Sequence, residues 1–339
     1  MSRRRRRPEA KLPPGCDPAS IILTFPVASE HAGQRLDRFV QHRIPRLSRT
    51  RAQEIVRACA YRPDGTKRRA SERVRAGETV LLVRPPFEEP NVPLYFDVLY
   101  EDDEILAIDK PAGLPVHPSA TYHKNTLTRL LRERFGDSAP QIAHRLDRET
   151  SGLLLCGRTR AAERALKRDF ENRRVRKRYL AIVRGVMPDD RGCIELPMDR
   201  AREGLHLLME VTPEGYRAIT HYQVVARRPD ATLVVLAPES GRQHQLRVHL
   251  SAQGFPIIGD KLYGPEGPQP FLDYIETGMT SGLLRRLGHH RHALHAYELE
   301  FNHPATGQTM TIRAPLPGDL LELWGAPLDA VGLVVGAAC

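Results

Sequence analysis

Residues 144–155 read HRLDRETSGLLL, and this stretch decides how the chain is expected to fold. Its first part brings basic residues next to one carboxylate, Asp147, and Gly152 then permits a turn that a residue with a Cβ atom would resist. Residues 153–155 are a short, continuous apolar run, which predicts a strand buried on both faces. We therefore expect a loop that holds Asp147 at the entry to a core strand and aims it into a cleft.

Taken alone, the HRLD turn also fits a surface ion pair between Asp147 and Arg145 or Arg148, which would contribute little to stability. The rest of the chain favours a site instead. Further stretches read KPAGLPVHP at 110–118, KRYLAIVRG at 177–185, SGRQHQLRVHLSAQGFPIIGDKLYG at 240–264 and HALHAYELEFNHPATG at 292–307. In this order, and together with HRLDRETSGLLL, they resemble the RluA family of pseudouridine synthases over about residues 90–315.

The resemblance implies an enzyme that isomerises uridine in RNA: it breaks the glycosidic bond, turns the base over and rejoins it through carbon. Asp147 would face the ribose, either as the nucleophile at the anomeric carbon or as the base that removes a ribose proton. Tyr179 matches the tyrosine that stacks on the uracil, and Arg247 matches the arginine that pairs with the aspartate. Arg242, which lies nearby in the sequence, is the second candidate for that pairing.

Other residues are expected to hold the RNA. Because a paired uridine must be flipped out of its stack, Arg145 would fill the vacated place with its guanidinium plane. We also expect His144 and Arg242 to contact the substrate. The reaction has no redox step, so we predict no cofactor and no metal. Histidines do cluster at the end of the 265–291 insertion and just beyond it, but no Cys or carboxylate joins them at a diagnostic spacing; they are His289, His290, His292 and His295.

Charge separates the chain into two parts. Residues 1–85 carry 20 Lys+Arg and 8 Asp+Glu, a net charge of +12, whereas the remaining residues carry 31 and 33, a net charge of −2. Such asymmetry indicates a polyanion-binding module joined to a nearly neutral body. Residues 21–85 resemble the S-four type of RNA-binding module, on Arg35-Leu36-Asp37 and Ser48-Arg49. The segment 61–69 departs from that pattern, and a basic helix pair that packs on the body remains the alternative.

The predicted organisation is a disordered basic tail (1–20), the S-four-like domain (21–85), a proline-rich linker (86–93), the catalytic domain (94–325) and a C-terminal tail (326–339). The fold class is α+β, with a mixed, mostly antiparallel sheet, flanking helices and a small N-terminal α/β module. We predict helices over 35–44 and 49–58, with Ser48 as the N-cap of the second, and N-caps at Asn125 and Thr159. We predict an extended conformation for 240–250, with Arg247 and His249 on one face.

The same observations limit the function. No apolar run is long enough to span a membrane, the start resembles no secretory signal, and the five scattered cysteines suggest reduced thiols, so we expect a cytoplasmic protein. The predicted partner is RNA: we expect large-subunit ribosomal RNA, with tRNA as the alternative, and we expect the protein to be a monomer. A non-catalytic ribosome-assembly factor on the same fold is the alternative function. A nucleoside hydrolase fits less well, because no site for an activated water is evident.

Overall fold

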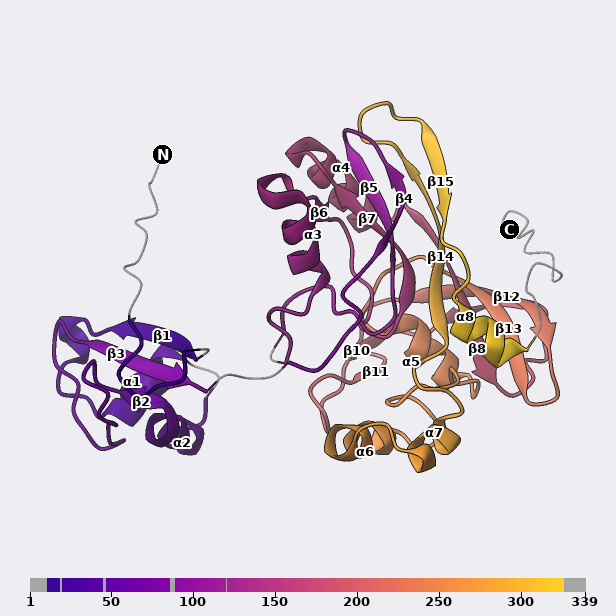
Figure 1. Ribbon diagram of the computed structural model, residues 1–339. Coiled ribbons are helices and arrows are strands. Elements are labelled where there is room, and N and C mark those ends of the chain that lie inside the picture. The colour runs from indigo at the N-terminus through magenta and orange to yellow at the C-terminus, as the bar shows by residue number, and fades with distance from the viewer. Residues whose placement is uncertain (1–10, 19, 45–46, 86–88, 120, 326–339) are drawn as a thin grey trace. The chain divides into compact units, whose positions relative to one another are not determined.

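The computed structural model describes residues 11–18, 20–44, 47–85, 89–119 and 121–325. The chain divides between residues 88 and 89 into two compact units, which are described separately (Figure 1). The C-terminal tail predicted at 326–339 lies outside the described residues, as do residues 1–10 and 19 of the predicted basic tail and residues 86–88 of the linker.

The N-terminal unit is a small antiparallel sheet, in the strand order β1-β3-β2, covered by two helices. Its elements are β1 (Ile21–Pro26), a 3-10 turn (Ser29–His31), α1 (Leu36–Arg43), α2 (Arg49–Cys59), β2 (Ala60–Tyr61) and β3 (Thr79–Arg84). The predicted helix pair is confirmed, and Ser48 caps α2 by accepting a hydrogen bond from the Arg51 amide at 3.2 Å. Apolar residues at helical spacing form the core of this unit, among them Leu36, Phe39, Ala52 and Val56.

A buried carboxylate joins the two helices of this unit. Asp37 is fully buried and accepts hydrogen bonds from Arg35 at 2.8 Å, from Gln53 at 3.0 Å and from the Arg38 amide at 2.8 Å. Because Gln53 lies on α2, this network fixes the angle between the helices. The Arg-Leu-Asp motif therefore has a structural use in this unit, whereas the other arginines of α1 and α2 are exposed.

The second unit is built on a ten-stranded mixed sheet, in the order β4-β5-β7-β14-β8-β13-β12-β9, with β15 beside β14 and β6 beside β7. The strands are β4 (Asp97–Glu101), β5 (Ile105–Lys110), β6 (Gln141–Ile142), β7 (Ser151–Gly157), β8 (Arg176–Arg184), β9 (Arg191–Glu195), β12 (Ile219–Arg227), β13 (Ala231–Pro238), β14 (Leu294–Asn302) and β15 (Thr309–Arg313). A separate two-stranded ribbon consists of β10 (Met198–Arg200) and β11 (Met209–Val211).

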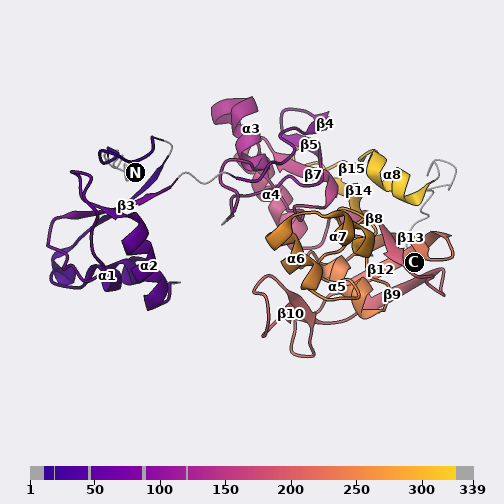
Figure 2. The ribbon, with the colours of Figure 1, turned by 60° about the horizontal axis from the view of Figure 1, so that its bottom comes forward.

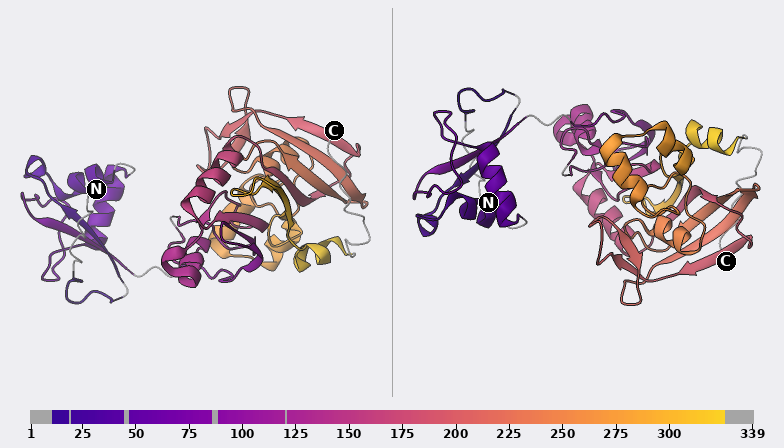
Figure 3. Two further views of the ribbon diagram at one scale, coloured as in Figure 1. Left: turned by 90° about the horizontal axis from the view of Figure 1, so that it is seen from above. Right: turned by 90° about the horizontal axis from the view of Figure 1, so that it is seen from below.

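Strand β14 joins two halves of this sheet. It lies antiparallel to β8 and parallel to β7, through the pairs His295–Ser151 and Ala296–Gly152. The yellow-orange strand β14, labelled in Figure 1 and seen from above and below in Figure 3, lies between the magenta strands of one half and the salmon strands of the other. Gly152 has φ +107°, and a Cβ atom there would collide with the backbone of Ala296, so only glycine allows this close approach.

Both faces of β7 are buried, as the apolar run 153–155 predicted. Leu154 and Cys156 pack with α3 (Leu127–Phe135) on one face, whereas Leu153 and Leu155 pack with α4 (Arg160–Glu171) on the other. The predicted cap of α4 is confirmed, since the Thr159 hydroxyl accepts from the Ala162 amide at 3.0 Å. The cap predicted at Asn125 is wrong by one residue: the Thr126 hydroxyl accepts from Arg129, and the Asn125 side chain donates to the carbonyl of Pro90.

The extended conformation predicted for 240–250 is also wrong, because residues Gln245–Ala252 form a helix, α5. The alternation of polar and apolar residues suggested a strand, yet the polar side chains here are buried as well. Gln245 bonds to Ser240 and to the carbonyl of Ile219, and His249 bonds to Thr220 and to the carbonyl of Leu196. A helix buried on all sides has no polar face from which its period could be read.

The 265–291 insertion contains two short helices, α6 (Gln269–Thr277) and α7 (Ser281–Leu287), which lie side by side and come to the front in Figure 2. The remaining elements are a 3-10 turn (Gly136–Ser138) and α8 (Gly318–Trp324). No helix within the described residues is long and apolar enough to cross a membrane, and Cys16, Cys59, Cys156 and Cys193 are free thiols.

Candidate active site

Asp147 lies in the loop that leads into β7, and a buried lysine supports this loop. The backbone turns tightly here, since the Thr150 amide donates to the Asp147 carbonyl at 3.2 Å. Lys110 is fully buried, and its Nζ donates to the carbonyls of Arg148, Leu114 and Pro111 at 3.1, 3.0 and 2.8 Å. Burial lowers the pKa of Lys110 to about 7. The lysine thus ties the KPAGLP segment to the Asp147 loop, a role that the sequence did not reveal.

Arg247 is the arginine at Asp147. Its Nη1 donates to Asp147 Oδ2 at 3.0 Å, while its Nε and Nη2 donate to the two oxygens of Asp260 at 2.6 and 2.8 Å. Burial lowers the pKa of the guanidinium, but Asp260 and then Asp147 raise it above its ordinary value. Asp260 is itself fixed by the amides of Leu262 and Tyr263. Arg247 is therefore a rigid cation that presents one N–H to Asp147.

Arg242 lies elsewhere in the site. Its guanidinium is stacked 4.6 Å above the ring of Tyr216, and its buried Nε has no hydrogen-bond partner among the described residues. Of the two arginines considered for the pairing with Asp147, the structure brings only Arg247 to the carboxylate. Arg242 lines a small cavity beside Asp147, so its position is compatible with contact to a ligand.

Tyr179 belongs to β8, opposite Ala296 of β14 and Leu236 of β13. It lines the same cavity of about 90 Å³ as Asp147 and Arg247. Burial, and next the charge of Asp147, raises the pKa of the Tyr179 phenol above its usual range. The ring is therefore a neutral aromatic wall beside the carboxylate.

Arg145 and His144 point to different surroundings. Arg145 is exposed and lines both the 90 Å³ cavity and a larger one of about 360 Å³. His144 lines neither cavity: its ring stacks on Phe170 at 4.4 Å, and its Nε2 accepts from the Leu155 amide at 3.1 Å. Burial lowers the pKa of His144 to about 3. His144 is thus a half-buried residue packed on Phe170, and its expected contact with the substrate stays a prediction.

The two cavities share five lining residues: Arg145, Leu146, Asp147, His244 and Arg247. The larger cavity is also lined by Lys261 and by Phe271 of α6. His244, Asp260 and Lys261 were missed as members of the site. Only their place within the matching stretch 240–264 pointed to them, because the sequence alone could not tell which polar residues of that stretch turn inward.

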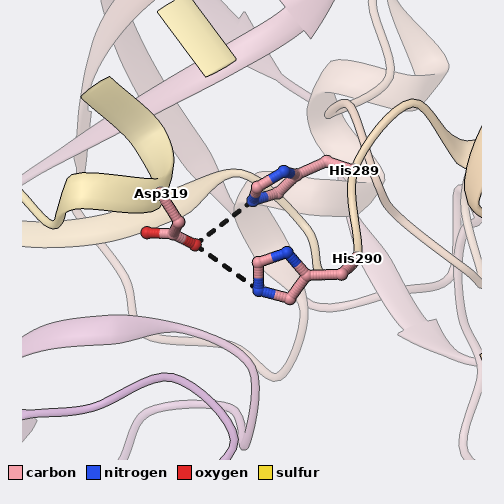
Figure 4. A group of neighbouring side chains, drawn as sticks. All are labelled: His289, His290 and Asp319. Atoms are coloured by element: carbon pink, nitrogen blue, oxygen red, sulfur yellow. Dashed lines mark hydrogen bonds and ion pairs between the residues drawn. The ribbon is translucent and has the colours of Figure 1, made fainter. Parts of the chain in front are cut away.

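In the folded protein, the carboxylate of Asp319 lies beside His289 and His290, a contact that the sequence did not indicate. Asp319, from α8, lies 3.2 Å from His289 Nε2 and 3.6 Å from His290 Nε2, and the three side chains face one another in Figure 4. Asp319 also forms a bidentate ion pair with Arg291, at 2.6 and 3.0 Å. Burial alone would raise the pKa of Asp319, but hydrogen bonds from His289 and Arg291 lower it well below its usual range. The carboxylate is already neutralised by a guanidinium, which opposes a cation at this place.

Asp147 in the loop before β7, Arg247 of α5 and Tyr179 of β8 line one cavity of the second unit, and Arg145 lies beside them. A carboxylate paired with a buried arginine beside an aromatic ring is an arrangement expected of an enzyme that acts on a base and its ribose. Residues 104–252 match the RNA pseudouridylate synthase family, and the chain belongs to this family, whose members isomerise uridine in RNA. This assignment confirms the predicted enzyme class and the α+β fold.

The chain is similar to several bacterial proteins over most of its length. It is 38% identical over 310 residues to ribosomal large subunit pseudouridine synthase D of Xanthomonas campestris, which covers 88% of this chain and 91% of that protein. It is 33% identical over 311 residues to the uncharacterised RNA pseudouridine synthase YlyB of Bacillus subtilis, over 89% of this chain and 96% of that protein. Its fold resembles human RNA pseudouridylate synthase domain containing 1, with a TM-score of 0.53, 29% identity, and coverage of 70% of this chain and 89% of that one.

Proposed function

We propose that Asp147 is the residue that acts on the ribose of the target uridine, with Arg247 as its partner and Tyr179 as the surface on which the uracil stacks. The observation that carries this proposal is the 3.0 Å ion pair between Asp147 and Arg247 in a cavity that Tyr179 also lines. Asp147 can act as the nucleophile or as the base, since both courses need an ionised carboxylate at the sugar.

The test is the rate of pseudouridine formation by purified Asp147→Ala. We expect no detectable product while RNA binding and the melting curve stay close to those of the wild type, because Asp147 is 22% exposed and is not part of the core. A matched control is Asp137→Ala, which removes an exposed carboxylate outside both cavities. Product formation by Asp147→Ala at a rate near that of the wild type would refute the assignment.

We propose large-subunit ribosomal RNA as the substrate, with tRNA as the alternative. Support comes from the relatives named ribosomal large subunit pseudouridine synthase D, which match this chain over most of its length. Arg145, exposed beside Asp147, would fill the place of the flipped nucleotide. Chemical mapping of pseudouridines in ribosomal RNA and tRNA, from cells with and without the gene, distinguishes the two substrates by the RNA in which a modification disappears.

We further propose that the N-terminal unit, residues 21–85, is an S-four-like module that binds RNA. Its helix pair exposes arginines on α1 and α2, namely Arg38, Arg43, Arg49, Arg51 and Arg57. An open hollow nearby is lined by Arg35, Arg38, His42 and Arg73. Such groups suit phosphates, whose neutralisation releases counterions and makes affinity depend on salt.

Deleting residues 1–85 tests whether the N-terminal unit supplies RNA affinity while the second unit supplies the chemistry. We expect weaker RNA binding, and a slope of log affinity against log salt that falls by about 0.7–0.9 for each lost phosphate contact. The remaining unit should still convert uridine in short RNA fragments at high concentration. An unchanged slope in filter-binding experiments would mean that the basic residues do not contact RNA.

We also propose that the enzyme needs neither metal nor cofactor, because isomerisation of uridine has no redox step. We propose separately that it is a cytoplasmic monomer. Activity should then survive chelators, and the protein should elute from a sizing column as one chain. Loss of turnover with EDTA and its recovery with zinc would contradict the first expectation and would direct attention to His289 and His290.

A further inference from the structure

His244 adopts a backbone conformation that side chains rarely occupy. It has φ 56° and ψ 13°, in the left-handed region, although it is not glycine. It immediately precedes α5, and its carbonyl accepts the Val248 amide at 3.0 Å. Strain of this kind persists where the surroundings enforce it, and it is concentrated at functional sites. The conformation places the imidazole in the lining of both cavities beside Asp147.

A hydrogen-bond chain fixes one nitrogen of this imidazole. The Met209 amide donates to the Tyr263 hydroxyl oxygen at 3.0 Å, and that oxygen lies 2.7 Å from His244 Nδ1. A phenol has a single hydrogen to donate, and His244 Nδ1 is the acceptor that the described residues offer it. Tyr263 therefore donates to Nδ1, and the proton of a neutral imidazole is left on Nε2.

The charges around Nε2 favour the same tautomer. Burial lowers the pKa of His244 to about 4, against the opposing effect of Asp147, so the ring is neutral near pH 7. Nε2 lies 3.8 Å from Asp147 Oδ2, which is too far for a hydrogen bond and close enough for strong electrostatic interaction. A bare lone pair on Nε2 would face the carboxylate, whereas an N–H is attracted to it. We assign the Nε2–H tautomer on both grounds.

We propose that the Nε2–H of His244 donates a hydrogen bond to the C2 carbonyl oxygen of the target uracil as the glycosidic bond breaks. This inference rests on the proposed role of Asp147. Whether Asp147 attacks the anomeric carbon or removes a ribose proton, the C1′–N1 bond breaks and its electron pair stays on uracil, spread over N1 and the carbonyl oxygens. The carbon that carries the C2 oxygen is bonded directly to N1, so the C2 oxygen is the base oxygen nearest the ribose and nearest Asp147.

The Nε2–H of His244 has two advantages for catalysis: it is held in place, and the ring that carries it is neutral. Negative charge on the C2 oxygen grows only as the bond breaks, so a donor held beside it stabilises the transition state more than the bound uridine. Because the ring is neutral, it does not compete with Arg247 for the charge of Asp147. Tyr263 is the positioning residue of this arrangement, since it acts only through the tautomer and orientation of His244.

Three substitutions at position 244 separate this role from a structural one. In His244→Gln the amide nitrogen reaches about as far as Nε2, whereas in His244→Asn it reaches only about as far as Nδ1. Asn tolerates the left-handed region better than Gln or Ala. We therefore expect His244→Asn to be the most stable of the three and to lose about 10²-fold in single-turnover rate, as His244→Ala does, with RNA affinity unchanged.

His244→Gln should recover part of that loss despite its lower stability. A rate that followed stability instead, with His244→Asn the fastest, would refute the proposal. Tyr263→Phe should lower the rate of the wild type but should not lower the rate of His244→Ala any further, because its effect passes through the imidazole. An equal loss in both backgrounds would show that Tyr263 acts by another route.

Substrate analogues test the partner atom. Sulfur is a weak hydrogen-bond acceptor, so 2-thiouridine at the target position should slow the wild type and leave His244→Ala nearly unaffected, whereas 4-thiouridine should change both by the same factor. Equal effects of 2-thiouridine on both proteins would overturn the proposal, as would wild-type turnover by His244→Ala. If the wild type itself gave no product on ribosomal RNA fragments, the proposed substrate would be wrong, a result distinct from either of these.

Discussion

Replacing Asp260 by Asn should destabilise the second unit strongly. Asp260 is 2% exposed and accepts two hydrogen bonds from Arg247 and one from each of two backbone amides. Asparagine keeps the shape but removes the charge, so the guanidinium of Arg247 loses its buried counter-ion. The other anion at Arg247 is Asp147, whose side chain is 22% exposed and partly screened by water.

The size of the effect follows from this burial. Breaking a buried ion pair by removing one partner costs about 3–5 kcal/mol. For a unit of this size, each kcal/mol lowers the melting temperature by roughly 2–4 °C, so a loss of about 6 °C or more is expected. Burial alone would raise the pKa of Asp260, but Arg247 and the amides lower it. A carboxyl whose pKa is lowered by folding stabilises above about pH 4, and that contribution disappears as the pH falls further.

The single tryptophan makes the measurement specific. Trp324 is buried in the core of the second unit, so its fluorescence during urea or thermal unfolding reports this unit alone. The control is Glu133→Gln, which breaks the exposed pair with Arg129 and should change stability by at most about 1 kcal/mol. Our account of Arg247 would be wrong if the free energy of unfolding of Asp260→Asn lay within about 1 kcal/mol of the wild-type value at pH 7. It would also be wrong if the difference in free energy of unfolding were the same at pH 3 as at pH 7.

Four other substitutions test the site and the sheet. Arg247→Ala should abolish turnover, and Arg242→Ala should retain more of it; the opposite order would mean that the wrong arginine was assigned to Asp147. Tyr179→Phe keeps the ring and removes the hydroxyl, so filter binding should show unchanged RNA affinity while single-turnover rates fall. Gly152→Ala should lower the melting temperature of the second unit and its activity together, because the added Cβ collides with the backbone of β14; a stable, fully active variant would contradict the close approach of β7 and β14.

Local signals in the sequence predicted many elements of the fold. The Ser48 and Thr159 caps, the helix pair at residues 36–59 and the doubly buried strand at 153–155 were predicted because each follows from a short pattern of residue types. The pairing of Asp147 with Arg247 followed from the family resemblance rather than from any pattern within the chain. The structure has the two side chains in contact although 100 residues separate them.

Residues whose surroundings are set by distant segments could not be predicted. The 245–252 helix was taken for a strand because Arg247 and His249 were assumed to lie on a polar face, whereas both are buried against partners from other elements. For the same reason the roles of Lys110, Asp260 and Asp319 could not be predicted, although the first two lie within stretches that resemble the family. Each is an ordinary charged residue in the sequence, and only the fold shows which groups surround it.

The position of β14 in the sheet has a consequence for synthesis of the protein. Asp147 lies in the loop before β7, in one half of the sheet, and Arg247 lies on α5, which follows β13 of the other half. Strand β14, which ends at Asn302, joins the two halves. At about 5–20 residues per second, the ribosome needs on the order of 8–30 s to extend the chain from Asp147 to Asn302. Strands of the N-terminal unit end at Arg84 and are complete earlier. A growing chain therefore carries its finished basic unit for some time before its catalytic groups can meet.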